Sequence, residues 1–131
     1  MATSIPDAVS TQLLWDVDSD HRGDIITDPA GIRVTIGGIY IITATLRWLA
    51  GAPGERYFNV IRDTNRNDRL AHAGGSYDGA APVTLNLSAV VSMEAGDSVL
   101  AYAYQKTGGP LGLDLAFSGP LLAVGLIRPF D

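Results

Sequence analysis

Carboxylates at alternate positions near the start of the chain could hold a hard cation. The run consists of Asp16, Asp18, Asp20 and Asp24. Oxygen ligands of this kind suit calcium. The run departs from the calcium-loop pattern, because His21 stands at its sixth position in place of glycine and Thr27 at its twelfth in place of glutamate. The same aspartates can instead cap turns of a solvated loop. A calcium site therefore stays an alternative, and we expect no other metal and no cofactor.

No motif in the chain predicts catalysis. A hydrolase needs a nucleophile, a base and an orienting acid. His72 lies in a run of small residues that we interpret as a loop, and Ser76 beside it lacks the nucleophile-elbow spacing. A carboxylate pair for glycoside cleavage stays open, because only a structure gives its separation. We expect a non-enzymatic protein with no catalytic residue.

Arginines and acidic residues are mixed between Arg62 and Arg69. One interpretation is a solvated loop with local ion pairs, each of little net energy. The other is a rim that binds an acidic partner surface, because a guanidinium binds carboxylates in pairs. The sequence leaves both open.

Length and composition limit the classes of protein to consider. The chain has 131 residues, 47% of them apolar, which predicts one folded domain. Its net charge of −5 argues against nucleic-acid binding, which needs clustered basic residues. With no cysteine there is no disulfide framework. The first residues do not resemble a signal peptide, and the longest apolar run, Leu121–Ile127, is too short to cross a bilayer, so we expect no membrane partner.

Alternation of apolar and polar residues predicts strands rather than helices. Two long segments, Tyr40–Trp48 and Val83–Met93, have the period of half-buried antiparallel strands. Shorter strands are predicted at Gln12–Trp15, Ile32–Ile36, Tyr57–Arg62 and Leu113–Phe117. Glycine- and proline-rich turns separate the strands, at Gly51–Gly54, Gly74–Gly75, Asp78–Gly79, Glu94–Asp97 and Gly108–Pro110. This pattern predicts an all-β sandwich or jelly roll.

Two further segments, Val99–Tyr104 and Leu121–Ile127, are apolar on both faces. One face can serve the core, and the other must be covered, because soluble monomers rarely expose large apolar patches. The cover is either a second copy of the chain or the chain's own loops. Residues 1–10 are polar and contain a proline, and we interpret them as a loose N-terminal arm before a domain at 11–131.

Three fragments, in order, resemble the globular heads of complement's first component and the related tumour necrosis factor jelly rolls. They are Gly38–Ile42 (GIYII), Ala95–Val99 (AGDSV) and Phe117–Leu122 (FSGPLL). The resemblance extends over residues 10–127. It departs at Pro120, where the family usually has an aromatic residue.

The resemblance implies a ten-stranded jelly roll that forms a homotrimer and has a binding or scaffold role rather than an enzymatic one. In the family, strands like the two that are apolar on both faces lie near the trimer centre. The residues expected at the trimer interface are therefore Tyr102, Tyr104, Leu122, Val124 and Leu126.

The segment Trp15–Arg33 is similar to short jelly rolls carried by tailed bacteriophages. That similarity implies a virion protein made in the host cytoplasm: a capsid decoration or head-fibre knob bound to the major capsid protein or another virion protein. The expected capsid-binding arm is Thr3, Ser4, Ile5 and Pro6. The alternative is a receptor-binding knob of a tail or head fibre that holds a host surface glycan through its outer loops.

Overall fold

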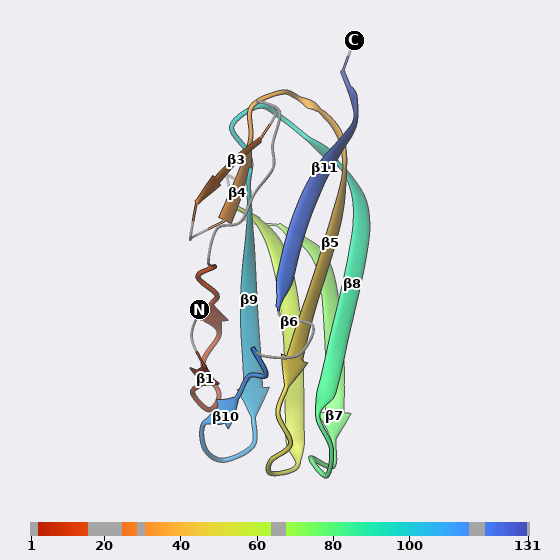
Figure 1. Cartoon of the computed structure of the whole chain (residues 1–131). Coiled ribbons are helices and arrows are strands. Elements are labelled where there is room, and N and C mark those ends of the chain that lie inside the picture. Colours follow the sequence, from red (N-terminus) through yellow and green to blue (C-terminus); the bar gives the residue numbers. More distant parts are fainter. Residues whose placement is uncertain (1–2, 16–24, 29–30, 64–67, 116–119, 131) are drawn as a thin grey trace.

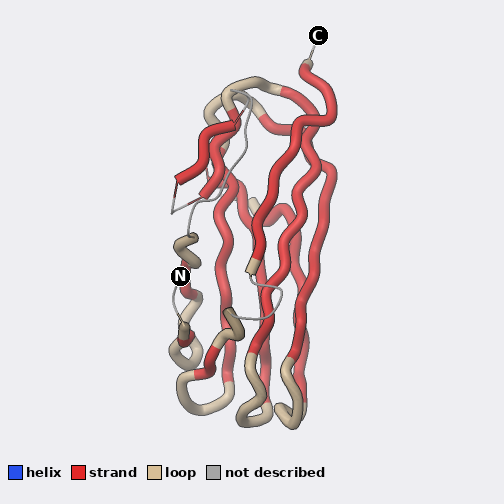
Figure 2. Tube along the Cα trace, viewed as in Figure 1, coloured by secondary structure: helices blue, strands red, loops and turns tan. Residues whose placement is uncertain are grey.

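The computed structural model of the chain describes residues 3–15, 25–28, 31–63, 68–115 and 120–130. These residues form eleven strands and no helix (Figure 2). Accordingly, none of them belongs to a helix long and apolar enough to span a membrane.

One layer of the sandwich is a three-stranded antiparallel sheet (Figure 1). Its strand order is β11 (Leu121–Pro129), β5 (Gly38–Trp48) and β8 (Val83–Met93). In the central strand the even-numbered residues from Tyr40 to Trp48 are buried and the odd-numbered ones are more exposed. The period of two thus confirms the two long strands predicted from the sequence.

The other layer is a six-stranded antiparallel sheet. Its main path runs β3 (Ile25–Asp28), β4 (Gly31–Val34), β9 (Ser98–Lys106), β6 (Gly54–Asp63) and β7 (Arg69–Tyr77), and β2 (Thr11–Gln12) pairs with β9. A separate two-residue pair joins β1 (Ser4–Ile5) to β10 (Leu111–Gly112). The all-β jelly roll is confirmed. The described residues contain eleven strands rather than the ten implied, and β1, β2 and β10 have only two residues each.

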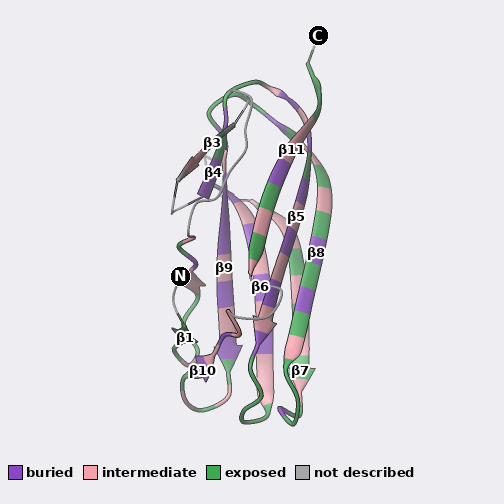
Figure 3. Ribbon diagram, in the orientation of Figure 1, coloured by how far each residue is buried: buried purple, intermediate pink, exposed green. Residues whose placement is uncertain are grey.

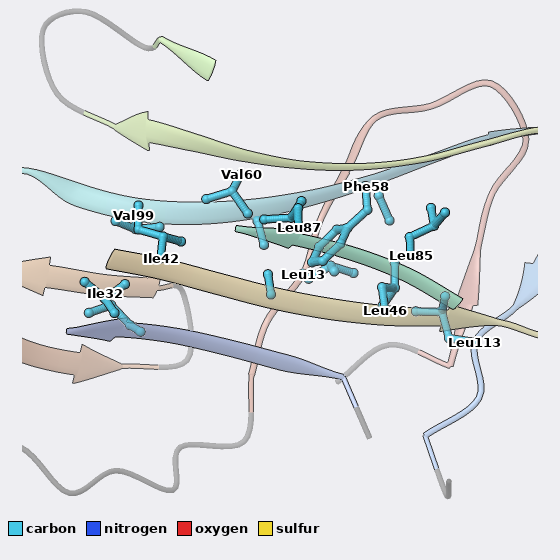
Figure 4. Packing of buried hydrophobic residues seen from close by; sticks show 14 of the residues in the cluster. Leu13, Ile32, Ile42, Leu46, Phe58, Val60, Leu85, Leu87, Val99 and Leu113 are labelled. Carbon is cyan, nitrogen blue, oxygen red and sulfur yellow. The ribbon is translucent and has the colours of Figure 1, made fainter. Parts of the chain in front are cut away.

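The hydrophobic core fills the space between the two sheets (Figure 4). Trp48, Tyr40 and Ile42 from β5 are fully buried, as is Phe58 from β6. Figure 3 shows the resulting bands of buried and exposed residues along β8. The buried rows leave the opposite face of each sheet on the outside of the molecule.

Strand β7 was not predicted from the sequence. The expected turn at Gly74–Gly75 lies within this strand, opposite Tyr57 and Arg56 of β6. The sequence interpretation was wrong here because β7 consists mainly of small and polar residues with no clear alternation. Pairing with β6 makes it a strand, and His72 therefore lies on a sheet rather than in a loop.

Within the described residues 3–10, the N-terminal segment is held on the domain, which corrects the interpretation of this stretch as a loose arm. Ile5 is fully buried and belongs to the core cluster. Ser4–Ile5 pair with β10, and the amide of Ala8 donates to the carbonyl oxygen of Gln105 at 2.8 Å. The apolar residues of this stretch, Ile5, Ala8 and Val9 among them, show no period of two, so the sequence could not indicate this burial.

Gln105 of β9 holds this segment in place from inside. Its side chain is fully buried, and its Nε2 donates to the carbonyl oxygens of Ile5 at 2.9 Å and Gly109 at 2.8 Å. Its Oε1 accepts a hydrogen bond from the hydroxyl of Thr107 at 2.7 Å. Asp7 adds two further bonds, accepting from the amides of Thr107 and Gly108 at 2.9 Å each. The buried amide is thus fully satisfied, as a buried polar group must be.

Candidate functional site

The outer face of the β11–β5–β8 sheet carries exposed apolar side chains from all three strands. We call this surface the apolar face. Its exposed members are Ile41, Val90, Leu121, Ala123 and Ile127, and the half-buried Ile39 and Gly125 lie among them. Val90 is 63% exposed and Ile127 is 53% exposed. Ile41 is paired with Val90 on one side and with Gly125 on the other, so these residues are continuous across the strands.

The structure corrects the choice of interface residues on β11. Leu122, Val124 and Leu126 point to the core side of that strand. Val124 is buried in the core cluster, and the other two pack against it. The sequence showed that both sides of the segment are apolar, but it could not show which side faces the core. The outward set is Leu121, Ala123, Gly125 and Ile127.

Tyr102 and Tyr104, the other two residues expected at the trimer interface, lie on the opposite side of the sandwich. They alternate along β9 with the buried residues Ala101, Ala103 and Gln105. They therefore belong to the outer face of the six-stranded sheet. The structure does not bring the five expected interface residues together.

An aromatic cluster covers part of that outer face. Tyr57 of β6 stacks on His72 of β7, with 5.3 Å between ring centroids and 22° between ring planes. Tyr104 of β9 lies on the other side of Tyr57, with a centroid distance of 6.2 Å. Cross-strand neighbours in β6, β7 and β9 thus place three rings in a row.

A surface hollow, which we call the aromatic depression, lies along this cluster. One part has a volume of about 380 Å³ and is lined by Ser10, Tyr57, Asn59, Arg69, His72 and Tyr104. A second part of about 220 Å³ shares Ser10, Asn59 and Arg69 and adds Ile61 and Tyr102. The depression therefore combines aromatic rings, hydrogen-bonding groups and one cation.

A hydrogen bond within the depression determines which polar atoms of His72 and Asn59 remain available to a ligand. Nδ1 of His72 lies 2.5 Å from Oδ1 of Asn59. An amide oxygen only accepts, so Nδ1 of His72 donates in this arrangement. That leaves Nε2 of the imidazole and the Nδ2 amide hydrogens of Asn59 for other partners. No sequence pattern indicates this site, because its residues come from segments that only the fold brings together.

The two arginines at the ends of the Arg62–Arg69 run have different environments. Arg62 is buried, and its guanidinium lies 3.2 Å from Asp68 and 3.5 Å from Asp97. It lines a hollow of about 440 Å³ with Glu94 and other residues, but its charge is already paired. Arg69 is exposed and lines both this hollow and the aromatic depression. The rim hypothesis thus concerns Arg69 rather than Arg62.

Several predicted residues have no role that the structure defines. The acidic run Asp16, Asp18, Asp20 and Asp24 lies outside the described residues. Of the expected capsid-binding arm, Thr3, Ser4 and Pro6 are exposed, whereas Ile5 is in the core. Within the described ranges, no three His, Asp or Glu residues are grouped to hold a metal ion.

Strand order, register and the two-layer core define the class: a jelly roll of the tumour necrosis factor and complement-head type. Jelly rolls of this type are typically non-enzymatic and typically form homotrimers. No protein-family model matches the sequence, and no curated protein matches it.

Solved structures place the chain within that class by fold. The structure of murine APRIL at pH 8.5 superposes with a TM-score of 0.74 and 18% identity, over 96% of this chain and 93% of that one. Eiger, a tumour necrosis factor from S. frugiperda, gives 0.70 and 15%, over 98% and 88%. The globular domain of zebrafish complement 1qA gives 0.63 and 13%, over 98% of both chains. The fold implied by the sequence resemblance is thus confirmed.

Proposed function

We propose that the chain forms a non-enzymatic homotrimeric head and that the apolar face is its subunit interface. The observation that carries this proposal is the exposure of Ile41, Val90, Leu121 and Ile127 together on one sheet. Apolar surface of this kind marks an interaction site on a soluble protein. The fold supports a threefold assembly, because homotrimers are typical of its class.

The trimer is tested by light scattering on the purified chain at micromolar concentration. We expect a mass three times the 13.8 kDa of one chain. A mass of 13.8 kDa across the accessible concentration range would overturn the proposal.

We further propose that this head is a structural protein of a tailed-phage virion and that it decorates the capsid surface. The support is the similarity of Trp15–Arg33 to short phage-borne jelly rolls. Three copies about one axis match the local threefold positions of an icosahedral shell. The exposed side chains of Thr3, Ser4 and Pro6 are the proposed contacts with the major capsid protein.

Cosedimentation separates this role from that of a receptor-binding knob. The purified chain is mixed with empty capsids of the phage that encodes it and, separately, with cell walls of its host. A capsid decoration is expected in the capsid pellet and absent from the cell-wall pellet. The reverse distribution, or binding to neither particle, would contradict the capsid role.

A further inference from the structure

We propose that the aromatic depression binds a saccharide whose sugar rings carry a carboxylate. This inference goes beyond the trimeric head, and it places a ligand on a sheet face rather than in outer loops. It does not depend on the trimer, because the depression and the apolar face lie on opposite sheets of the sandwich.

Aromatic rings form the floor of the proposed site. Tyr57 and Tyr104 are half-buried in the sheet surface, so part of each ring is already desolvated and its position is held by neighbours. Tyrosine offers a large amphipathic surface with little rotamer entropy to lose on binding. The apolar C–H face of a pyranose ring matches such a floor, and its hydroxyls then point to the polar groups around it.

Polar groups stand beside the rings and can bond the hydroxyls of a sugar. Asn59 and Ser10 line both parts of the depression, and His72 lines the larger one. Together they supply amide, hydroxyl and imidazole groups that both donate and accept hydrogen bonds. Sugar hydroxyls also do both, whereas a purely apolar ligand would leave these groups unpaired at a cost.

Charge selects an acidic sugar within this class. In the part of the chain that the structure describes, Arg69 is the only arginine, lysine or carboxylate that lines either part of the depression, and it lies at the border with the hollow that Asp68 and Glu94 line. Among the described residues, no salt bridge joins Arg69 to a carboxylate, in contrast to Arg62. A guanidinium binds a carboxylate with two parallel hydrogen bonds. In a chain of net charge −5, this local cation favours an anion that the rest of the molecule would repel.

The size of the depression suits a short oligosaccharide. Its larger part, about 380 Å³, falls at the small end of the roughly 300–1,000 Å³ typical of small-molecule sites. The smaller part continues past Asn59 toward Tyr102. One ring over Tyr57 and Tyr104 and the next toward Tyr102 would use both parts.

Titration calorimetry with tetragalacturonate tests the proposal, and its fully methyl-esterified form is the matched neutral ligand. We expect the acid to bind and the ester to bind at least about tenfold more weakly. Arg69→Gln should weaken binding of the acid about tenfold and leave binding of the ester unchanged. Arg33→Gln is the charge control, because Arg33 is exposed on β4 and does not line the depression. It should change neither affinity.

The ring contribution is tested with Tyr57→Ala and Tyr104→Ala, each of which should weaken binding of both ligands. Tyr57→Phe keeps the ring and should retain most of the affinity, which separates stacking from loss of fold. Circular dichroism checks the fold of each variant, and light scattering reports the trimer independently. A monomer that binds the acid would overturn the trimer and leave this site standing.

Three results would overturn the saccharide site. The first is that the acid at millimolar concentration gives no heat of binding. The second is that the acid and the ester bind with equal affinity. The third is that the folded Tyr57→Ala and Tyr104→Ala variants bind both ligands as tightly as the unmodified protein. Adenosine monophosphate is the competing occupant, since a base can also stack on tyrosine. Tighter binding of that nucleotide than of the tetrasaccharide would likewise contradict the proposal.

Discussion

Gly74 shows how one residue shapes the outer face of the six-stranded sheet. Its φ of +146° is a conformation that side chains with a Cβ rarely adopt. A Cβ there would lie 2.2 Å from the carbonyl oxygen of Arg56 and 2.5 Å from Cδ1 of Tyr57. The absence of a side chain therefore lets the Tyr57 ring lie close to the strand and beside His72.

We predict that Gly74→Ala lowers the free energy of unfolding by about 2 kcal/mol or more, because it combines an unfavourable φ with a backbone collision. Urea denaturation measures the change. The neighbouring Gly75→Ala is the control, since an added Cβ at Gly75 meets no atom within 4 Å. It should change stability by less than about 1 kcal/mol, and an equal loss in both variants would contradict this account.

The sequence predicts the burial of core residues better than it predicts which surface residues lie together. Tyr40 and Trp48 were expected on one face of a strand from their period of two, and both are buried. The positions of Asn59 and His72 could not be predicted, because they are brought together by pairing of β6 with β7. The alternation of apolar and polar residues along a strand indicates which side chains are buried. Contacts between strands depend on the pairing register, which that alternation does not specify.

Elements with strong alternation were predicted, and those stabilised by their neighbours were not. Strands β5 and β8 follow the predicted segments closely. The predicted strand at Leu113–Phe117 is not formed at Leu113, which makes only an isolated bridge to Trp48. Strand β7 and the N-terminal segment gain their structure from contacts made by other elements. Both sides of β11 are apolar, so the sequence could not show which side faces the core, and the inward-facing residues were wrongly chosen for the interface.

We predict that Ile5→Ala lowers the free energy of unfolding by about 2–5 kcal/mol, the range for truncating a fully buried isoleucine. Urea denaturation of the variant measures the loss. Val9→Ala in the same segment is the matched control, because Val9 is 52% exposed. It should change stability by no more than about 0.5 kcal/mol. A loose arm would instead make both substitutions neutral.

At the scale of the whole molecule, the two proposed binding surfaces lie on different sheets. The apolar face on β11, β5 and β8 is the proposed contact with sister chains, and the aromatic depression lies on the other sheet. Assembly through the first face leaves three copies of the depression accessible. Weak binding at one copy is strengthened when several copies engage the same polymer.

We predict that Val90→Asp converts the trimer to monomers, because it places three charges in an apolar contact without partners. Val90 is 63% exposed in one chain, so the substitution should leave the monomer folded. Ser76→Asp, at an exposed position of β7 on the other sheet, is the control and should stay trimeric. Light scattering reports the mass of each. A trimeric Val90→Asp would place the interface elsewhere.

The hydrogen bond from Gln105 to Ile5 joins residues 100 positions apart. During synthesis, β1 therefore cannot make this contact until Gln105 has left the ribosome. Contacts of such long sequence separation slow folding. The native burial of Ile5 therefore has to follow the formation of β9 and β10, which makes the docking of β1 a late folding event.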